Sequence, residues 1–238
     1  KIPTQRTRLT SVTLQKLHPL MDIYKTSSKK KITSLILLST IFILAAVLRF
    51  YYLNRTLGGH DENAMLLYFG YAPLKMIVTS YWDTSNHIFH TILVKLMGTL
   101  FGEENSIAIR LPTLVFGLAG LWMVYKIALE LFNSYLIARM ALLIATVNPV
   151  HIHYSQTARG YSLIIFFSAV TILTSLKVLQ SGISRSRGIL IVICGFLSVY
   201  TISTNIYFLI GLGMWVLFIL LLHDPQKKFF KDKEDRRQ

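Results

Sequence analysis

Residues 188–222 read GILIVICGFLSVYTISTNIYFLIGLGMWVLFILLL, a run of 35 residues without a charged side chain. A helix needs only about 20 apolar residues to cross the hydrocarbon core of a bilayer. The run is therefore too long for one span, and we expect it to break at Ser203-Thr204-Asn205 into two. A chain that contains such a run is expected to be an integral membrane protein.

The rest of the chain follows the same pattern. Hydrophobic residues make up 53% of it, charged residues 15%, and its mean hydropathy is +0.51, which leaves too little polar surface for a soluble globule. Further apolar segments cover residues 32–53, 87–101, 107–132, 135–150 and 160–179. With the divided run, these give about seven segments. They predict an all-α polytopic transmembrane helical bundle over residues 32–222.

The formal charge of +14 is concentrated ahead of the first apolar segment. Eight of the basic residues lie within residues 1–31, and such a flank is an orientation signal near anionic lipid. We therefore expect residues 1–31 to be cytoplasmic, residues 54–85 to form the first outer loop, and the multi-pass protein to lie in the plasma (inner) membrane. No basic stripe with interleaved aromatic residues is present, which argues against a nucleic-acid partner.

Three further expectations concern the ends and the topology of the chain. Its first residue is Lys, so the chain is expected to be a fragment, with residues 223–238 as a truncated charged tail. Strict alternation of seven spans would place Arg185, Arg187 and this tail outside, which the positive-inside rule disfavours. A short segment between residues 87 and 150 that does not span fully would remove the conflict.

Within the first outer loop, apolar residues recur at helical spacing. This pattern predicts an amphipathic helix in the interface plane, which Pro73 kinks or ends. The residues are Ala64, Leu67, Tyr68, Tyr71, Leu74 and Val78.

Acidic residues are scarce, since residues 32–222 hold only six. Three of them, Asp61, Glu62 and Asp83, lie in the first outer loop, where a carboxylate stays hydrated and still reaches a cavity between helices. They are candidates for water-facing chemistry on a membrane-borne substrate. The alternative is that Asp61 and Glu62 are first-turn acids favoured by the helix dipole, an effect of roughly 0.3–1 kcal/mol.

Two arginines lie in apolar surroundings, where a charge costs roughly 2.5–3.5 kcal/mol unless it is paired or reaches the interface. Arg110 and Arg159 are therefore expected to hold a bound anion or to form structural ion pairs. For Arg110, Glu103 and Glu104 are close in sequence and offer the second explanation. Arg159 lies among the hydrogen-bonding residues of the stretch HYSQTARGY at 153–161.

The histidines do not predict a metal site. His87 and His90 are three residues apart and share a helix face, but no Glu accompanies them as in H-E-x-x-H. We expect His87 to line a polar cleft near Asn86 and Trp82. Cys194 is the only cysteine, which excludes a disulfide and a cysteine-based metal site within the chain.

Six short motifs occur in a fixed order along the chain: GHDE at 59–62, WDTSNH at 82–87, FG at 101–102, RLP at 110–112, NP at 148–149 and HYSQTARGYSL at 153–163. The ordered set resembles the N-terminal module of polyprenyl-phosphate-sugar-dependent membrane glycosyltransferases of the C-type fold. These include the protein O-mannosyltransferase-like and lipid A aminoarabinose transferase-like families. The resemblance covers about residues 49 to 179. It departs from the family at Ile88-Phe89, where two prolines are usual.

The resemblance implies an inverting transferase at the outer membrane face. The donor is a sugar on a polyprenyl phosphate, used as a substrate with no separate cofactor, and the acceptor is a hydroxyl of a protein, lipid or glycan. Asp61 is favoured over Glu62 as the base, and Arg159 or Arg110 stabilises the departing phosphate. The expected substrate-binding residues are completed by His87, Tyr161, Trp82 and Asp83. A non-catalytic protein that handles isoprenoid lipid and a truncated scaffold relative are the alternatives.

Overall fold

The computed structural model describes residues 32–81 and 83–222, and every regular element in those ranges is helical. The predicted all-α fold is thus confirmed. The chain divides into two compact units, Lys1–Ile43 and Leu44–Gln238. In the first, the described residues are the start of the apolar helix Ile32–Phe50, which ends in the second unit. The second unit holds all other described elements.

Among the described residues, four helices are long and apolar enough to cross a membrane: Ile32–Phe50, Ser106–Phe132, Tyr161–Ser181 and Ser203–Leu222. A bent pair, Tyr135–Val147 with Pro149–Ser155, makes a fifth if it is counted as one span. The polytopic membrane protein is confirmed, and each of the seven expected apolar segments contains a helix, but two of these helices are too short to be candidate spans. The helix α4 (Ile88–Phe101) has 14 residues, or about 21 Å at 1.5 Å per residue, and α9 (Arg185–Thr201) has 17.

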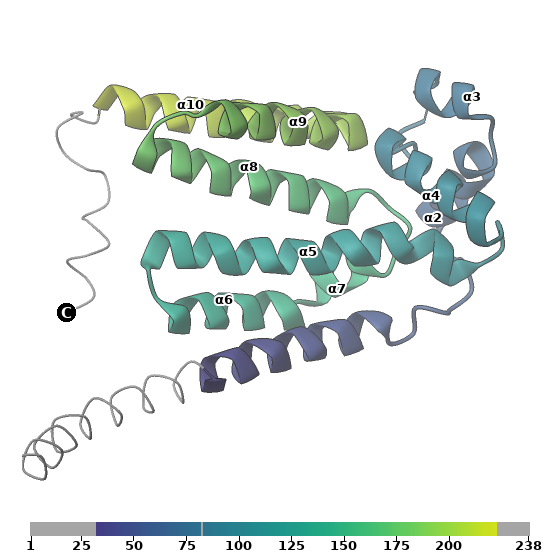
Figure 1. Ribbon diagram of the computed structural model, residues 1–238. Helices are drawn as coiled ribbons and strands as arrows, with labels where there is room; N and C mark the ends of the chain where they lie inside the picture. The colour runs from purple at the N-terminus through teal and green to yellow at the C-terminus, as the bar shows by residue number, and fades with distance from the viewer. Residues whose placement is uncertain (1–31, 82, 223–238) are drawn as a thin grey trace, which may run out of the picture. The chain divides into compact units, whose positions relative to one another are not determined.

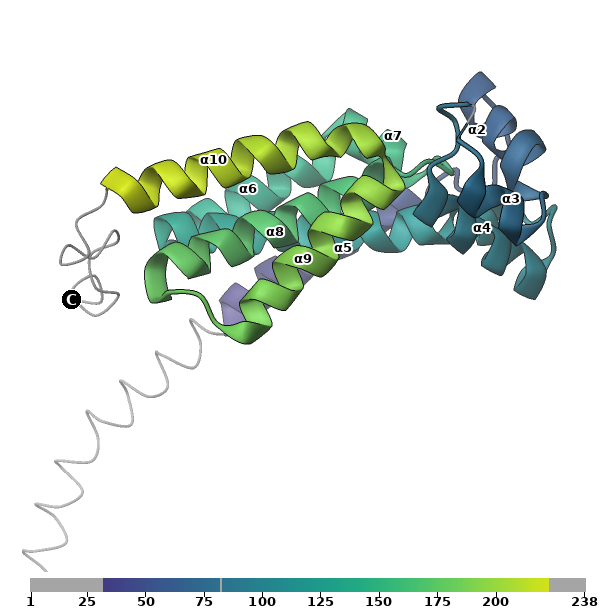
Figure 2. The ribbon, with the colours of Figure 1, turned by 90° about the horizontal axis from the view of Figure 1, so that it is seen from above.

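In the second unit, α5 (Ser106–Phe132) and α8 (Tyr161–Ser181) pack against each other at the centre. The helices α6 (Tyr135–Val147) and α7 (Pro149–Ser155) lie against α5, and α9 lies against α8 (Figure 1 and Figure 2). The last helix, α10 (Ile206–Leu222), has no buried residue. The helices α5 and α8 therefore form the core that positions the segment between α7 and α8.

The predicted segment 135–150 is broken rather than continuous, because α6 ends at Val147 and α7 continues at an angle of 65°. The Asn148 side chain accepts hydrogen bonds from the backbone N–H groups of Val150 (2.9 Å) and His151 (3.1 Å). Pro149 follows at the first position of α7, where its missing N–H costs nothing. A capping residue followed by proline starts a new helix here.

The break expected at Ser203-Thr204-Asn205 is present as a 3₁₀ turn, Ser203–Asn205, between α9 and α10. Asn205 Nδ2 donates to Ser168 Oγ on α8 at 3.1 Å. The turn is therefore fastened to the bundle.

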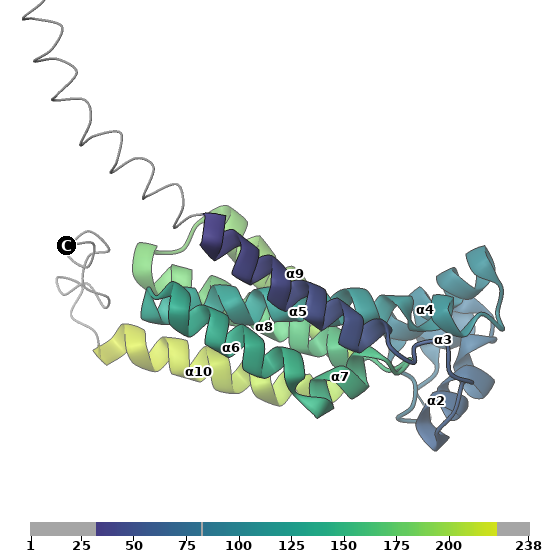
Figure 3. The ribbon, with the colours of Figure 1, turned by 90° about the horizontal axis from the view of Figure 1, so that it is seen from below.

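Residues 54–85, expected to form the first outer loop, contain three short elements in place of the single interfacial helix. They are α2 (His60–Met65), a π-helical turn (Leu66–Gly70) and α3 (Leu74–Thr79), which begins directly after Pro73. Met65 and Leu66 pack with Val94, Ile109 and Ala158 in a buried cluster. Figure 1 and Figure 3 show α2, α3 and α4 gathered at one end of the bundle. That packing brings the Asp61-Glu62 pair to the segment between α7 and α8.

Candidate functional site at the α7–α8 segment

The two neighbouring acids at the start of α2 have opposite surroundings. Gly59 precedes the helix with a φ of 92°, a left-handed conformation that glycine adopts without strain. Successive residues on a helix point about 100° apart. The Asp61 side chain is accordingly 67% exposed, whereas that of Glu62 is 1% exposed.

Glu62 forms a buried, bidentate ion pair with Arg110 of α5. The Arg110 Nη2 to Glu62 Oε2 distance is 2.7 Å, and the Nε to Oε1 distance is 3.0 Å. The other Arg110 hydrogens go to the carbonyl oxygens of Leu53, Arg55 and Thr56. All five guanidinium donors are thereby used, which leaves none for a ligand.

The Glu62 carboxylate is also fully occupied. Besides Arg110, Oε1 accepts from the Ala158 N–H at 2.8 Å and Oε2 from the Gly58 N–H at 3.1 Å. Burial raises the pKa of Glu62, but the hydrogen bonds from Arg110, Ala158 and Gly58 outweigh it, so that its pKa lies below the usual value. The carboxylate is a fixed anion that ties α2, α5 and the α7–α8 segment together.

Asp61 lies beside Arg159, and both residues are expected from the sequence to act on the same substrate. The Asp61 Oδ2 to Arg159 Nη2 distance is 3.4 Å. Arg159 Nη1 donates to the carbonyl oxygens of Asp61 and Ser85, each at 3.3 Å. Its buried Nε has no hydrogen-bond partner within the described ranges. An exposed carboxylate thus adjoins a buried guanidinium that keeps a free donor.

Residues 156–160, which carry Arg159, are non-helical and are anchored to several elements. Gln156 Nε2 donates to three carbonyl oxygens at the end of the first helix, those of Leu48 (2.9 Å), Arg49 (3.3 Å) and Tyr51 (2.7 Å). Arg55 Nη2 donates back to the Gln156 carbonyl at 3.0 Å. The first helix therefore helps to set the position of Arg159.

Two further bonds hold this segment, one of them from Ala158 to Glu62 as described above. The other runs from the Gly160 N–H to His87 Nδ1 at 2.8 Å. His87 precedes α4, is 3% exposed, and its burial lowers its pKa to about 3, with a further lowering by the charge of Arg159. The ring is therefore neutral, with Nδ1 as the acceptor.

Aromatic rings also border Arg159. The Arg159 guanidinium lies 5.7 Å from the centre of the Tyr161 ring, a cation–π contact. The Tyr161 ring also contacts the rings of His87 (5.2 Å) and Tyr154 (4.4 Å). The structure thus brings together Asp61, Arg159, His87 and Tyr161 from three separate stretches of the chain.

The other candidates lie at the edge of this group or outside it. Asp83 Oδ1 accepts from the Ser85 N–H at 2.7 Å, and hydrogen bonds from Ser85, followed by the charges of Arg159 and His60, lower its pKa. Trp82 lies outside the described residues. Glu103 and Glu104, the sequence neighbours considered for Arg110, are not its partners. Within the described ranges, no group of three or more His, Cys, Asp or Glu residues could hold a metal ion.

Sequence reasoning missed a third buried arginine, Arg49, near the end of the first helix. It is 0% exposed and caps α6, donating to the carbonyl oxygens of Ala145 (3.5 Å) and Thr146 (3.1 Å). Its Nη2 also lies 3.0 Å from His151 Nδ1 on α7. The signal was a lone charge inside the apolar segment 32–53, where an unpaired guanidinium is costly.

Comparison with known proteins gives a family match. The family model described as dolichyl-phosphate-mannose-protein mannosyltransferase matches residues 83–234, more than half of the chain. No curated protein and no solved structure matches significantly. The match includes His87, Arg110, Arg159 and Tyr161 but begins after Asp61. The chain belongs to the dolichyl-phosphate-mannose-protein mannosyltransferase family of membrane glycosyltransferases.

Proposed function

We propose that the protein transfers a sugar from a polyprenyl phosphate donor to an acceptor hydroxyl at the extracytoplasmic membrane face, with inversion at the sugar C1. Mannose is the sugar that the family description suggests. The observation that supports this proposal is the pair of Asp61 and Arg159, with 3.4 Å between Asp61 Oδ2 and Arg159 Nη2. It places a solvent-accessible proton acceptor beside a buried cation.

In this reaction Asp61 accepts the proton of the acceptor hydroxyl while the hydroxyl oxygen attacks C1. The bond between C1 and the phosphate oxygen breaks, and the electron pair leaves with the phosphate. The buried guanidinium of Arg159 stabilises that developing negative charge, and the exclusion of water from its surroundings strengthens the interaction. The open exposure of Asp61 gives an acceptor access from the aqueous side.

Glu62 and Arg110 take a different part in this proposal. Every donor of Arg110 and every acceptor position of Glu62 is already used, so they support the site and do not contact the substrate. His87 accepts a hydrogen bond from Gly160, and Tyr161 contacts the Arg159 guanidinium, so both residues help to position Arg159. Asp83 lies near enough for its charge to act on Arg159 and serves as the second acid to test.

The test is sugar transfer from polyprenyl-phosphate mannose by the protein in liposomes. Asp61→Asn is nearly isosteric but not basic, and we expect it to lower turnover by about 10²-fold or more while donor binding persists. Glu104→Gln changes an exposed acid between α4 and α5 and is the matched control. Asp83→Asn is expected to retain most of the activity.

Unchanged transfer by Asp61→Asn would end the carboxylate mechanism. Loss that is confined to Asp83→Asn would move the base to that residue. Movement of isoprenoid lipid in a parent protein that transfers no sugar would favour the lipid-handling alternative.

A further inference from the structure

An apolar groove of about 530 Å³ lies between α10 and the core helices α5 and α8. It is lined by Leu131 of α5, by Ile172 and Leu176 of α8, and by four α10 residues from Phe208 to Trp215. Gly211 is one of the four, and a Cβ built on it would meet no atom of the described residues within 4 Å. Because α10 has no buried residue, the groove is open to another molecule.

The groove lies toward the end of the bundle that is opposite the Asp61 site. Leu131 is the second-last residue of α5, and Leu176 lies in the last two turns of α8. The α5–α6 and α8–α9 connections are at this end, opposite α2, α3 and α4 (Figure 1 and Figure 2). Since the Asp61 end is expected outside, this end is expected to face the cytoplasm. Arg185 and Arg187, at the start of α9, then obey the positive-inside rule.

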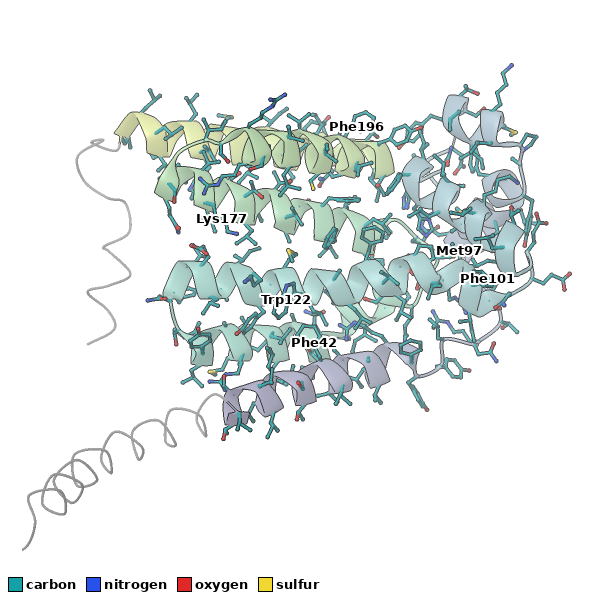
Figure 4. All side chains as sticks on the ribbon, viewed as in Figure 1. Phe42, Met97, Phe101, Trp122, Lys177 and Phe196 are labelled. Carbon is teal, nitrogen blue, oxygen red and sulfur yellow. The ribbon has the colours of Figure 1, made fainter. Side chains whose placement is uncertain are left out.

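Basic side chains gather at this end of the bundle. Among the described residues, the last two turns of α5 and α8 and the first two turns of α6 and α9 contain one acid, Glu130. The same turns contain five basic residues, namely Lys126, Arg139, Lys177, Arg185 and Arg187. Figure 4 shows Lys177 near this end of α8. Such an excess of positive charge attracts anionic lipid at a membrane surface.

Arg187 is held beside the groove by the end of α8. Its Nη1 donates to the carbonyl oxygens of Lys177 (3.3 Å) and Gly182 (2.6 Å), and Lys177 directly follows the groove residue Leu176. Within the described ranges these are the side-chain hydrogen bonds of Arg187, so that Nε and Nη2 remain available to a ligand. A guanidinium binds phosphate through adjacent donors of this kind. The apolar groove therefore ends beside a side chain suited to phosphate.

We propose that an anionic phospholipid of the membrane leaflet at this end binds here, with one acyl chain in the groove and its phosphate at Arg187. A water-sized group takes about 30 Å³, so that 530 Å³ holds about 18 carbon-sized groups, the size of one long acyl chain. The excess of positive charge selects an anionic headgroup over a zwitterionic one. The bound chain fills the space between α10 and the core helices and thereby helps to hold α10 in place.

Trp215 lines the groove and reports the lipid through its fluorescence. The full chain with Trp82→Phe and Trp122→Phe is placed in phosphatidylcholine vesicles that contain either phosphatidylglycerol or phosphatidylcholine with brominated acyl chains, which quench tryptophan on contact. We expect brominated phosphatidylglycerol to bind about fivefold better than brominated phosphatidylcholine, the scale of one basic residue near anionic lipid. Arg187→Gln should remove this preference. Arg139→Gln removes the same charge from α6, which contributes no residue to the groove, and should keep it.

Two glycines of α10 test the groove itself. Gly211 lines the groove and Gly213 does not, and a Cβ built on either would meet no atom of the described residues within 4 Å. Both positions therefore accept a larger side chain without a collision. Gly211→Leu fills the groove and is expected to abolish the selective quenching by brominated phosphatidylglycerol. Gly213→Leu is the matched control and should quench like the parent.

Four outcomes would overturn the proposal. Equal quenching by the two lipids in the parent would remove the anionic preference, and equal losses in Arg187→Gln and Arg139→Gln would assign it to general surface charge. Equal behaviour of Gly211→Leu and Gly213→Leu, or no quenching by either lipid, would show that no acyl chain occupies the groove. Relief of the quenching by an added isoprenyl phosphate would assign the groove to the sugar donor. None of these measurements involves sugar transfer, so the inference stands or falls apart from the proposed function.

Discussion

Glu62 of α2 and Arg110 of α5 are 48 residues apart in sequence and form a bidentate ion pair that is 1% and 0% exposed. Neither partner has a free hydrogen-bonding position. A buried ion pair of this kind adds little net stability over an apolar pair, but removal of one partner leaves the other as an uncompensated buried charge. The pair therefore fixes geometry more than it adds stability.

This arrangement predicts that Glu62→Gln and Arg110→Gln each lower the free energy of unfolding by about 3–5 kcal/mol. The double variant should lose much less than the sum, because neither unpaired charge remains. Thermal unfolding in detergent measures this, with Glu103→Gln as the exposed control. Additive losses in the double variant would contradict the coupling.

Two replacements of Arg159 test whether donor binding needs a guanidinium or only a positive charge. We predict that Arg159→Gln weakens binding of an isoprenyl phosphate by at least about tenfold, the scale of a charge-assisted hydrogen bond. Arg159→Lys should weaken it less, because ammonium keeps the charge but loses the fork of donors. Arg139→Gln, at a partly exposed residue of α6, is the control. If both Arg159 variants bind like the parent, this arginine is structural.

Gly160 is predicted to tolerate no side chain. In Gly160→Ala the new methyl group would collide with Thr201 Cγ2 and press on His87, which displaces Arg159 or α9. Overpacking of this kind typically costs about 1–3 kcal/mol. Thr201→Ser removes that methyl group and keeps the hydroxyl, so we expect it to restore part of the stability and donor binding of Gly160→Ala. Failure of any rescue would place the strain at His87 alone.

Acidic pH should destabilise the protein through His87. Its pKa is about 3 in the fold and about 6.5 when the chain is unfolded, so that between these values only the unfolded state binds the proton. The free energy of unfolding then falls as pH falls, by up to about 1.4 kcal/mol per pH unit for one histidine. His90, which burial shifts in the same direction, adds to the effect. Unfolding midpoints between pH 7 and pH 4 should decline less steeply in His87→Asn.

The sequence predicted the features that composition and local patterns control. The uncharged run 188–222 predicted that the chain is a membrane protein. The polar residues Ser203-Thr204-Asn205 within this run predicted where it breaks into two helices. Asp61 could be nominated because acidic residues are scarce within residues 32–222, and Arg159 because a guanidinium is costly in apolar surroundings. The 3.4 Å distance between Asp61 and Arg159 depends on packing between segments that are distant in sequence. The periodicity of the sequence contains no information on that packing.

The partner of Arg110 shows why the rest could not be predicted. Glu103 and Glu104 are near in sequence, but Glu62 meets Arg110 because α2 folds onto α5 through the cluster of Met65, Leu66 and Ile109. The bend between α6 and α7 was missed for a similar reason. An apolar segment records which residues avoid water, whereas the bend after α6 is set by capping at Asn148.

The segment 156–160 has no regular structure of its own, and its shape is held by the first helix, α2 and α4 through Gln156, Ala158 and Gly160. A peptide copied from this segment would not hold its arginine in place. The reactive arrangement is therefore a cooperative property that arises only after these helices have docked. Folding of the membrane bundle and assembly of the site are one event.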